Sequence, residues 1–360
     1  REGKIRMKKA GKIIGMFFAY LSATVLLFLF FVIFVILFLI YGPSEEARDL
    51  FVHSCQETSA LKFLPYWFMD GDSVDEILDP KTSAASARRG GPMLELGFSG
   101  ELDFDPADLE ELSEEDKAEL GIGYDAHGKV TVEEVNEGIY RGMMMIIPDP
   151  SRVVIGTLPN YSVGGTGKLL PKFIEDYGAI GGTNAGGFYD PDGRGAGGCP
   201  EGMVLENGTI RYGDDRVYIN VIGFDKDHRL MLGDWTPKQA LDAGVVSAVS
   251  FTDGLVLVKD GVPSPDQRSG VNPRTAIGQR PDGTILLLVI EGRHAGSLGA
   301  TADDLRDIFV RYGAENASML DGGTSAVMFF RGEQITRGSN LLGMRALPNA
   351  ILVMPSEDDP

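Results

Sequence analysis

The stretch TILLLVIEG, from Thr284 to Gly292, decides how the second half of this chain folds. It is an almost wholly apolar run between turn-forming residues, which predicts a central strand buried on both faces. Glu291 follows the run directly, so a carboxylate stands at the end of a buried strand. Such a carboxylate is either a paired structural charge or a proton donor whose pKa is raised by its surroundings.

Other strands are expected on both sides of this run. GMMMIIPDPSRVVIG (142–156) indicates two strands around a Pro-Asp-Pro turn. MVLENGTIRYG (203–213) carries an Asn-Gly pair between apolar runs, which is a strong hairpin signal. The region from about Lys129 onward is therefore rich in short strands that are broken by Gly and Asn turns.

Two helices are expected among these strands. TPKQALDAG (236–244) and TADDLRDIFVRYGA (301–314) each open with a threonine suited to cap a helix, and the second should end at Gly313. Strands outnumber helices without regular alternation. The pattern predicts an α+β domain with a mixed, mainly antiparallel β-sheet and a few packed helices.

A long apolar segment precedes this domain. Ile13 to Tyr41 contains no charged residue and exceeds the ~20 residues that a helix needs to cross a bilayer. The alternative is a cleaved signal peptide, whose apolar region is normally only ~7–15 residues long. We expect an uncleaved, single-pass transmembrane helix that contacts the lipid bilayer through residues 13–41.

Charges on either side of the segment predict its orientation. Basic residues precede it and mostly acidic residues follow it, so the positive-inside rule places the N-terminus in the cytoplasm and the soluble domain outside it. The basic residues are Arg1, Lys4, Arg6, Lys8, Lys9 and Lys12, and the acidic ones are Glu45, Glu46 and Asp49.

The chain divides by composition into four parts. An acidic run between residues 42 and 128 predicts a solvated helix from Pro106 to Leu120. The parts are a cytoplasmic basic tip (1–12), a transmembrane anchor (13–41), a membrane-proximal segment with an acidic linker (42–128) and the α+β domain (129–355).

Overall composition excludes some classes of function. The formal net charge of −19 disfavours nucleic acid as a partner, and 43% hydrophobic residues can supply a core. Cys55 and Cys199 allow at most one disulfide, and the sequence leaves their pairing open. The histidines and cysteines show no zinc-binding spacing.

Three glycine-flanked polar clusters lie at the ends of apolar runs. Glycine allows close backbone approach and exposes N–H groups to an anion, so an active site would be assembled here. The clusters are GGTNAGGFYDPDG (181–193), SGVNPRTAIG (269–278) and MLDGGTSAVMFF (319–330).

The third cluster carries the strongest candidate. A strand that ends at Leu320 would place Asp321 at its tip, although Asp-Gly-Gly is as often a plain hairpin turn. Arg274 and Arg293 are cations that could clamp a phosphate through two hydrogen bonds. Alternatively, one of them is the salt-bridge partner of Glu291 or Asp321.

A metal site is a weaker hypothesis. Asp190, Asp192 and Asp321 could supply oxygen ligands for a hard cation such as Ca²⁺. The segment Asp190-Pro-Asp-Gly193 is more typical of a turn, and the ligand set is incomplete. We therefore expect no cofactor.

Five motifs follow one another along the chain: Asn184 to Phe188, Pro273 to Gly278, Glu291 to Arg293, Leu320 to Ser325, and Arg345 with Asn349 to Val353. Together and in this order they resemble the phosphodiester glycosidase family, which includes an animal N-acetylglucosamine-1-phosphodiester α-N-acetylglucosaminidase. The resemblance covers roughly residues 129–354. The chain departs from the family at Thr324, where a third glycine or a similarly small residue is usual, and at Glu291, where an aspartate is frequent.

The resemblance implies cleavage of a sugar 1-phosphodiester, which releases the sugar and leaves a phosphomonoester. Asp321 would stabilise or attack the anomeric carbon, Glu291 would serve as acid/base, and Arg274 would hold the phosphate. The implied substrate-binding residues are Asn184, Gly186, Gly187, Arg293, Gly322, Gly323, Thr324, Ser325, Arg345 and Asn349.

Location and resemblance together predict an extracytoplasmic, membrane-anchored hydrolase. Its partner would be a carbohydrate or glycosyl-phosphate substrate in cell-envelope material or exopolysaccharide. The alternative is a non-catalytic surface module that binds or organises polysaccharide. Convergence of the Asp321 and Glu291 carboxyls next to an arginine would favour the enzyme.

Overall fold

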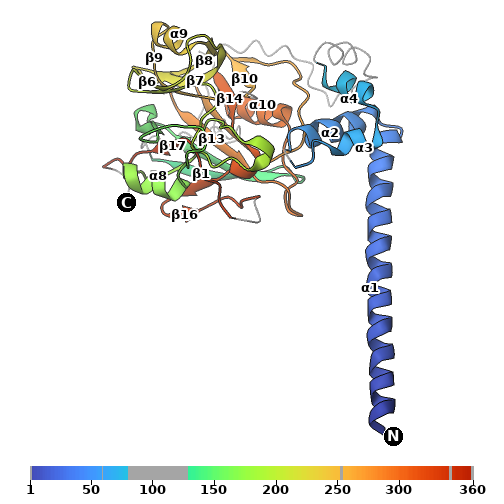
Figure 1. The fold of residues 1–360 in the computed structure, drawn as a ribbon. Coiled ribbons are helices and arrows are strands. Elements are labelled where there is room, and N and C mark those ends of the chain that lie inside the picture. The colour runs from blue at the N-terminus through green and yellow to red at the C-terminus, as the bar shows by residue number, and fades with distance from the viewer. Residues whose placement is uncertain (1, 59, 80–128, 252–253, 340–342, 358–360) are drawn as a thin grey trace, which may run out of the picture.

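The computed structural model describes residues 2–58, 60–79, 129–251, 254–339 and 343–357. One long helix stands beside a compact, strand-rich body, and three short helices lie between them (Figure 1). The predicted helix from Pro106 to Leu120 lies outside the described residues.

The described helices flank or precede the strands. The helices are α1 (Glu2–Tyr41), α2 (Glu45–Gln56), α3 (Leu64–Phe68), α4 (Gly71–Leu78), α8 (Leu170–Tyr177), α9 (Pro237–Asp242) and α10 (Ala302–Arg311), and the short 3₁₀ helices are η2 (Pro150–Arg152), η3 (Pro191–Gly193) and η4 (Gly323–Ser325).

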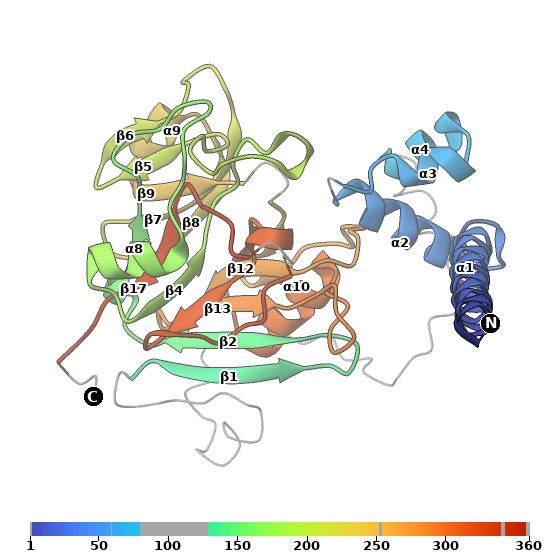
Figure 2. The ribbon, with the colours of Figure 1, turned by 60° about the horizontal axis from the view of Figure 1, so that its bottom comes forward.

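The strands form three sheets in which every described pairing between strands is antiparallel. The seven-stranded sheet has the order β1 (Thr131–Asn136), β2 (Arg141–Ile147), β13 (Ile285–Ile290), β12 (Arg274–Gln279), β14 (Asn316–Leu320), β10 (Val256–Lys259) and β11 (Val262–Pro263). Figure 2 shows β1, β2, β13 and β12 side by side.

The two smaller sheets have five strands each. The first has the order β16 (Glu333–Gln334), β15 (Met328–Phe330), β4 (Gly181–Asn184), β17 (Ala350–Val353) and β3 (Val153–Gly156); the second has the order β6 (Thr209–Tyr212), β5 (Val204–Glu206), β9 (Val245–Ser250), β7 (Ile219–Asp225) and β8 (Leu230–Trp235). We call them the β4 sheet and the β7 sheet.

β13 is the central strand predicted from its apolar run, and all six of its residues are buried. Its side chains alternate between two cores, as the period of a strand requires. Ile285, Leu287 and Val289 pack toward the β4 and β7 sheets, whereas Leu286 and Leu288 pack toward α10. Both faces of the large sheet are therefore covered.

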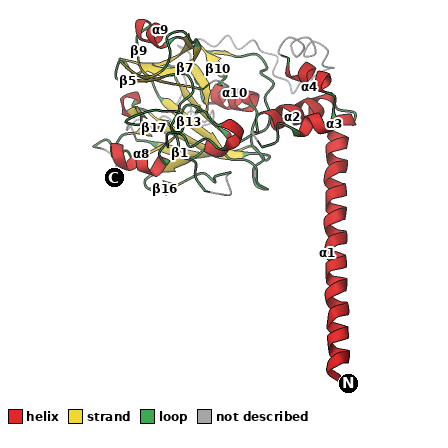
Figure 3. Cartoon of the chain, in the orientation of Figure 1, coloured by secondary structure: helices red, strands yellow, loops and turns green. Residues whose placement is uncertain are grey.

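Two further cores complete the layers. α8 packs on the outer face of the β4 sheet through Leu170 and Phe173, and α9 packs on the β7 sheet through Ala240. Figure 3 shows the strands at the centre of the body and these helices around it. The α+β architecture with mainly antiparallel sheets is confirmed.

The predicted hairpin turn and helix caps are also present in the structure. Asn207 and Gly208 both have positive φ, at 47° and 75°, and join β5 to β6 as the hairpin signal predicted. Thr236 and Thr301 each form a capping box. α10 ends at Arg311, slightly before the expected Gly313, which adopts a φ of 71°.

The N-terminal helix contains a stretch of 28 residues, Ile14–Tyr41, that is long and apolar enough to cross a membrane. Its side chains lie almost entirely outside the packing of the rest of the chain. Only Gly42, Pro43 and Ser44 separate α1 from α2. α2 and α4 pack together through a small core of Val52, Val74 and Ile77.

Replacing Leu287 of the central strand, with the exposed Leu298 as a control, tests how much this strand contributes to stability. Leu287→Ala leaves a cavity between the sheets and should lower the free energy of unfolding by about 2–5 kcal/mol. Leu298→Ala removes a side chain that is 59% exposed and should change it by less than about 0.5 kcal/mol. Urea unfolding of the detergent-solubilised chain measures both; equal losses would contradict the layered core.

Candidate active site

The loop after β14 carries Asp321 at the tip of a buried strand, as its sequence predicted. The Asp321 N–H donates to the Ala185 carbonyl at 2.9 Å, and the Asn184 amide donates to the Asp321 carbonyl. Gly322 lies so close to the Pro273 carbonyl that a Cβ atom would approach its oxygen to 2.7 Å. The Asp321–Ser325 loop is thereby fixed against neighbouring backbone on two sides.

Asn184 is a buried junction between two sheets. Its Oδ1 accepts hydrogen bonds from Thr275 Oγ1 at 2.8 Å and from the Val327 N–H at 3.2 Å. Thr275 belongs to the seven-stranded sheet, and Val327 precedes β15 of the β4 sheet. The predicted substrate-binding residue Asn184 thus holds the loops that surround the site.

The Asp321 carboxyl is strongly perturbed. Burial raises its pKa from 3.8 to about 7; the charges of Glu201 and Asp190 add to the rise, while a Ser325 hydrogen bond and Arg345 oppose it. At neutral pH this carboxyl is therefore close to half protonated. A carboxylate with such a pKa is a stronger base than an ordinary one.

Arg345 joins the loop of Asp321 to the loop that follows β4. Its Nη1 donates to Thr324 Oγ1 at 3.2 Å, and its Nη2 donates to Asp190 Oδ1 at 2.9 Å and to the Gly195 carbonyl at 3.0 Å. The guanidinium also lies 5.0 Å from the centroid of the Phe188 ring. Arg345 is thus held over the site by both loops.

Glu201 is a functional candidate that sequence reasoning missed. Its N–H donates to the Gly187 carbonyl at 2.9 Å, and a Cβ atom on Gly187 would lie 2.5 Å from Glu201 Oε2. Gly187 therefore leaves room for the Glu201 carboxylate. The only sequence signal was a carboxylate in the glycine-rich stretch before β5, which does not reveal its neighbour.

Gly186 and Asn349 meet behind this site. The Gly186 N–H donates to Asn349 Oδ1 at 2.7 Å, and Asn349 is 1% exposed. Among the described residues, Asn349 Nδ2 has no hydrogen-bond partner. The predicted pair thus lies together, with the Gly186 N–H bound to the side-chain amide oxygen of Asn349.

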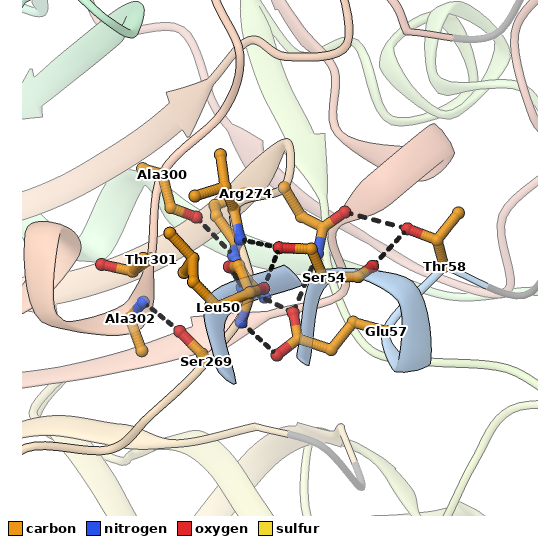
Figure 4. A network of polar contacts seen from close by, with 12 residues as sticks. Leu50, Ser54, Glu57, Thr58, Ser269, Arg274, Ala300, Thr301 and Ala302 are labelled. Carbon is orange, nitrogen blue, oxygen red and sulfur yellow. Dashed lines mark hydrogen bonds and ion pairs between the residues drawn. The ribbon is translucent and has the colours of Figure 1, made fainter. Parts of the chain in front are cut away.

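Arg274 and Arg293 form a second cluster next to the same loop. Arg274 is buried; it donates to the Ala300 carbonyl at 3.0 Å, to the Gly270 carbonyl, and to Glu57 Oε2 at 2.6 Å. Figure 4 shows this network. Neither arginine pairs with Glu291 or Asp321 among the described ion pairs, so that alternative is not supported.

Arg293 connects this cluster to the Asp321–Ser325 loop. Its Nη2 donates to Asn272 Oδ1 at 2.9 Å and to Thr58 Oγ1 at 3.1 Å. A Cβ atom on Gly323 would lie 3.7 Å from Arg293 Nη2. Gly323 is two residues from Asp321, a separation of no more than about 7 Å along the chain. Arg293 is therefore close to the candidate carboxylate loop.

Glu291 is engaged elsewhere. Its Oε2 lies 3.2 Å from His294 Nε2, and its Oε1 accepts from the Arg337 N–H at 2.6 Å. The charges that act most on Asp321 are those of Glu201, Arg345 and Asp190, rather than those of Glu291 or Arg274. Asp321 and Glu291 therefore have different immediate partners in the structure.

The aspartates considered as metal ligands are not gathered into a metal site in the described part of the structure. Asp190 accepts hydrogen bonds from Arg345 and from the Gly195 N–H, and the side chain of Asp192 lies outside the described part of the structure. Within the described part, no group of three or more His, Cys, Asp or Glu side chains could hold a metal ion. Cys55 and Cys199 are buried and unpaired with each other.

The sequence is similar to a known family and to a known bacterial protein. A family model described as phosphodiester glycosidase matches residues 177–354. A Bacillus subtilis (strain 168) protein, described as SPbeta prophage-derived uncharacterized protein YomE, is 36% identical over 116 residues, or 31% of this chain. The match spans only 18% of that protein's own length.

One solved structure shares the fold. The catalytic domain of zebrafish N-acetylglucosamine-1-phosphodiester α-N-acetylglucosaminidase, auto-inhibited by its pro-peptide, matches with a TM-score of 0.50 and 18% identity. The match covers 63% of this chain and 83% of that domain. A hypothetical protein from Synechocystis matches with a TM-score of 0.48 and 15% identity, over 62% of this chain and 61% of its own.

The family model covers β4, the Asp321–Ser325 loop, both arginine positions and β17. It therefore includes every element that carries the two clusters, apart from the Glu57 and Thr58 contacts. Residues 177–354 thus carry the sequence pattern of the phosphodiester glycosidase family.

Proposed function

We propose that this chain is a membrane-anchored hydrolase that cleaves the sugar–oxygen bond of a sugar 1-phosphodiester. The observation that carries the proposal is the Asp321 carboxyl, whose pKa is raised to about 7 beside the charges of Glu201 and Arg345. Paired carboxylates in unlike environments are typical of glycosidase sites. The family supports a glycosidase-type hydrolase, and the substrate class is our inference.

The chemistry assigns Asp321 an ionised role. The departing phosphomonoester is a weak base and needs little help from a proton donor. The difficult step is the formation of an oxocarbenium-like centre and its capture by water or by a carboxylate. Asp321, made more basic by burial, would attack that centre or take the proton from the attacking water.

Glu201 would be the second carboxylate, in place of the Glu291 that the sequence suggested. Its charge makes Asp321 more basic and would stabilise positive charge that develops on the sugar ring. Arg345 holds the Asp190 and Thr324 sides of the site together. Arg293, next to Gly323, is the cation best placed for the phosphate.

The second candidate function is a polysaccharide-binding module without turnover. The pairing of Glu291 with His294, away from any arginine side chain among the described ion pairs, is the observation that favours this alternative. The acidic set of Asp321, Glu201 and Asp190 around Arg345 is the observation that favours an enzyme. A binding site has no need for a carboxyl with a raised pKa.

The apolar helix supports a location at a membrane. At 1.5 Å per residue, the 28-residue stretch of α1 is about 42 Å long, more than a bilayer core of ~30 Å. We propose that it is an uncleaved anchor with the basic residues in the cytoplasm. The substrate would then be glycosyl-phosphate material of the cell envelope or an exopolysaccharide.

Protease protection tests this orientation. In sealed spheroplasts, added protease should degrade the domain from 129 onward, while in inside-out vesicles the domain should survive. An antibody against a C-terminal tag reports both results. Cleavage in the inside-out vesicles alone would reverse the proposed topology.

Replacing Asp321 tests the catalytic assignment. Asp321→Asn keeps the shape of the side chain but removes the base, so turnover of a glycosyl 1-phosphodiester should fall about 10²–10⁴-fold. Asp227→Asn, on an exposed turn where Lys226 is its partner, is the matched control and should leave turnover unchanged. Sugar release from a panel of such diesters measures both. Unchanged turnover in Asp321→Asn would contradict a catalytic role for Asp321.

The raised pKa of Asp321 also predicts opposite trends of activity and stability with pH. Activity should rise with pH and level off above about 7, as Asp321 ionises. The folded state keeps this proton up to about pH 7, whereas the unfolded chain loses it near 3.8, so stability falls across that window. Asp321→Asn should therefore melt at a higher temperature than wild type at pH 8, with the difference vanishing near pH 4. Melting temperatures of the variant and of wild type, measured by thermal unfolding at pH 4 and pH 8, test this prediction.

A further inference from the structure

The contacts of Glu57 link the membrane-proximal helices to the arginine cluster. Its Oε1 accepts from the Gly270 N–H at 2.8 Å, and its Oε2 accepts from Arg274 Nη2 at 2.6 Å and from Asn272 Nδ2 at 2.9 Å. All three donors lie within residues 270–274, which lead into β12 and include its first residue. A carboxylate bound by three donors is held in one place.

The helix that carries Glu57 is packed closely on this segment. The Val271 N–H donates to Ser54 Oγ at 2.9 Å, and a Cβ atom on Gly270 would approach Ser54 Cα to 2.3 Å. Figure 4 shows Ser54, Glu57 and Thr58 facing Arg274 from the end of α2. Glu57 is thus supplied by a segment that the family model does not cover.

Glu57 also sets the direction of Arg293. Because Asn272 Nδ2 donates to Glu57, Asn272 Oδ1 faces the other way, where it accepts from Arg293 Nη2. Arg293 keeps an exposed surface, and its described hydrogen-bond partners are the neutral Asn272 and Thr58. An accessible guanidinium without a carboxylate of its own can accept a ligand anion.

The charges of this cluster do not cancel. Arg274 and Glu57 are the two charges that act on the pKa of Arg293, which burial and Arg274 lower and Glu57 raises. Two guanidiniums (+2) and one carboxylate (−1) leave a local charge of +1. A phosphodiester carries one negative charge, whereas a phosphomonoester carries nearly two above its second pKa of about 6.

We propose that Glu57 is a specificity-determining residue that sets the charge of the Arg274–Arg293 site to match a phosphodiester monoanion rather than a phosphomonoester dianion. The choice of ligand rests on the proposed function. Glu57 acts through the two arginines, so the site binds the substrate class without retaining the more highly charged product. The membrane-proximal segment thereby takes part in selecting the substrate.

Direct binding of two small anions to the full chain in detergent at pH 8 tests this without requiring turnover. The probes are dimethyl phosphate, a monoanion, and methyl phosphate, a dianion, each titrated by calorimetry. Glu57→Gln should tighten binding about fivefold for each unit of ligand charge, as expected for charges a few ångströms apart in a partly exposed site. The preference for dianion over monoanion should then rise about fivefold.

Two controls separate charge from shape and from overall charge. Glu57→Asp keeps the carboxylate and should keep the wild-type preference. Glu46→Gln removes an exposed charge at the start of α2, away from the arginines, and should change neither affinity. An unchanged preference in Glu57→Gln, or a Glu57→Asp variant that behaves like it, would overturn the proposal. Faster diester turnover in Glu57→Gln with no change in preference would mean that Glu57 merely blocks the arginines, and would also overturn it.

Arg293→Gln provides the same test should Glu57→Gln fail to fold. Removing this exposed cation leaves a site of zero net charge, so methyl phosphate should lose about fivefold more affinity than dimethyl phosphate. Equal losses for the two anions would contradict the charge-matching role. Failure of the Asp321 experiment alone would sink the hydrolase assignment and leave these binding results intact.

Discussion

The buried amide of Asn184 is the junction on which the candidate site depends. Through its own hydrogen bonds it joins β12, the loop after β14 and the chain before β15, so two separate sheets share one polar contact. A buried amide is costly to leave unsatisfied, which makes the arrangement sharply defined. The position of Asp321 relative to Arg345 and Glu201 follows from this junction, because those residues lie on segments attached to the β4 and β7 sheets.

Much of the fold could be predicted because its signals are local. The apolar run of β13, the Asn-Gly hairpin and the threonine caps each specify their own backbone over a few residues. The strand that ends before Asp321 was predictable for the same reason. These elements depend on periodicity and turn chemistry that a short stretch of sequence contains.

The partners of the charged residues could not be predicted in this way. Glu291 has His294 as a partner, and the charge of Glu201 acts on Asp321 from a glycine-rich loop more than a hundred residues earlier. Arg274 pairs with Glu57, which lies in the membrane-proximal segment outside the predicted α+β domain. Such pairings depend on how sheets stack, and that stacking leaves no pattern around either residue.

The close junction between α1 and α2 affects how the protein can work at a surface. Three residues separate the helices, Tyr41 donates a hydrogen bond to the Phe68 carbonyl, and α2 is bound to the segment before β12. With α1 in a bilayer as proposed, this short, hydrogen-bonded connection restricts how far the domain can move relative to the membrane. Its site would then work at a fixed height, so a polymer would be cut only where its linkages come within that thin layer above the membrane.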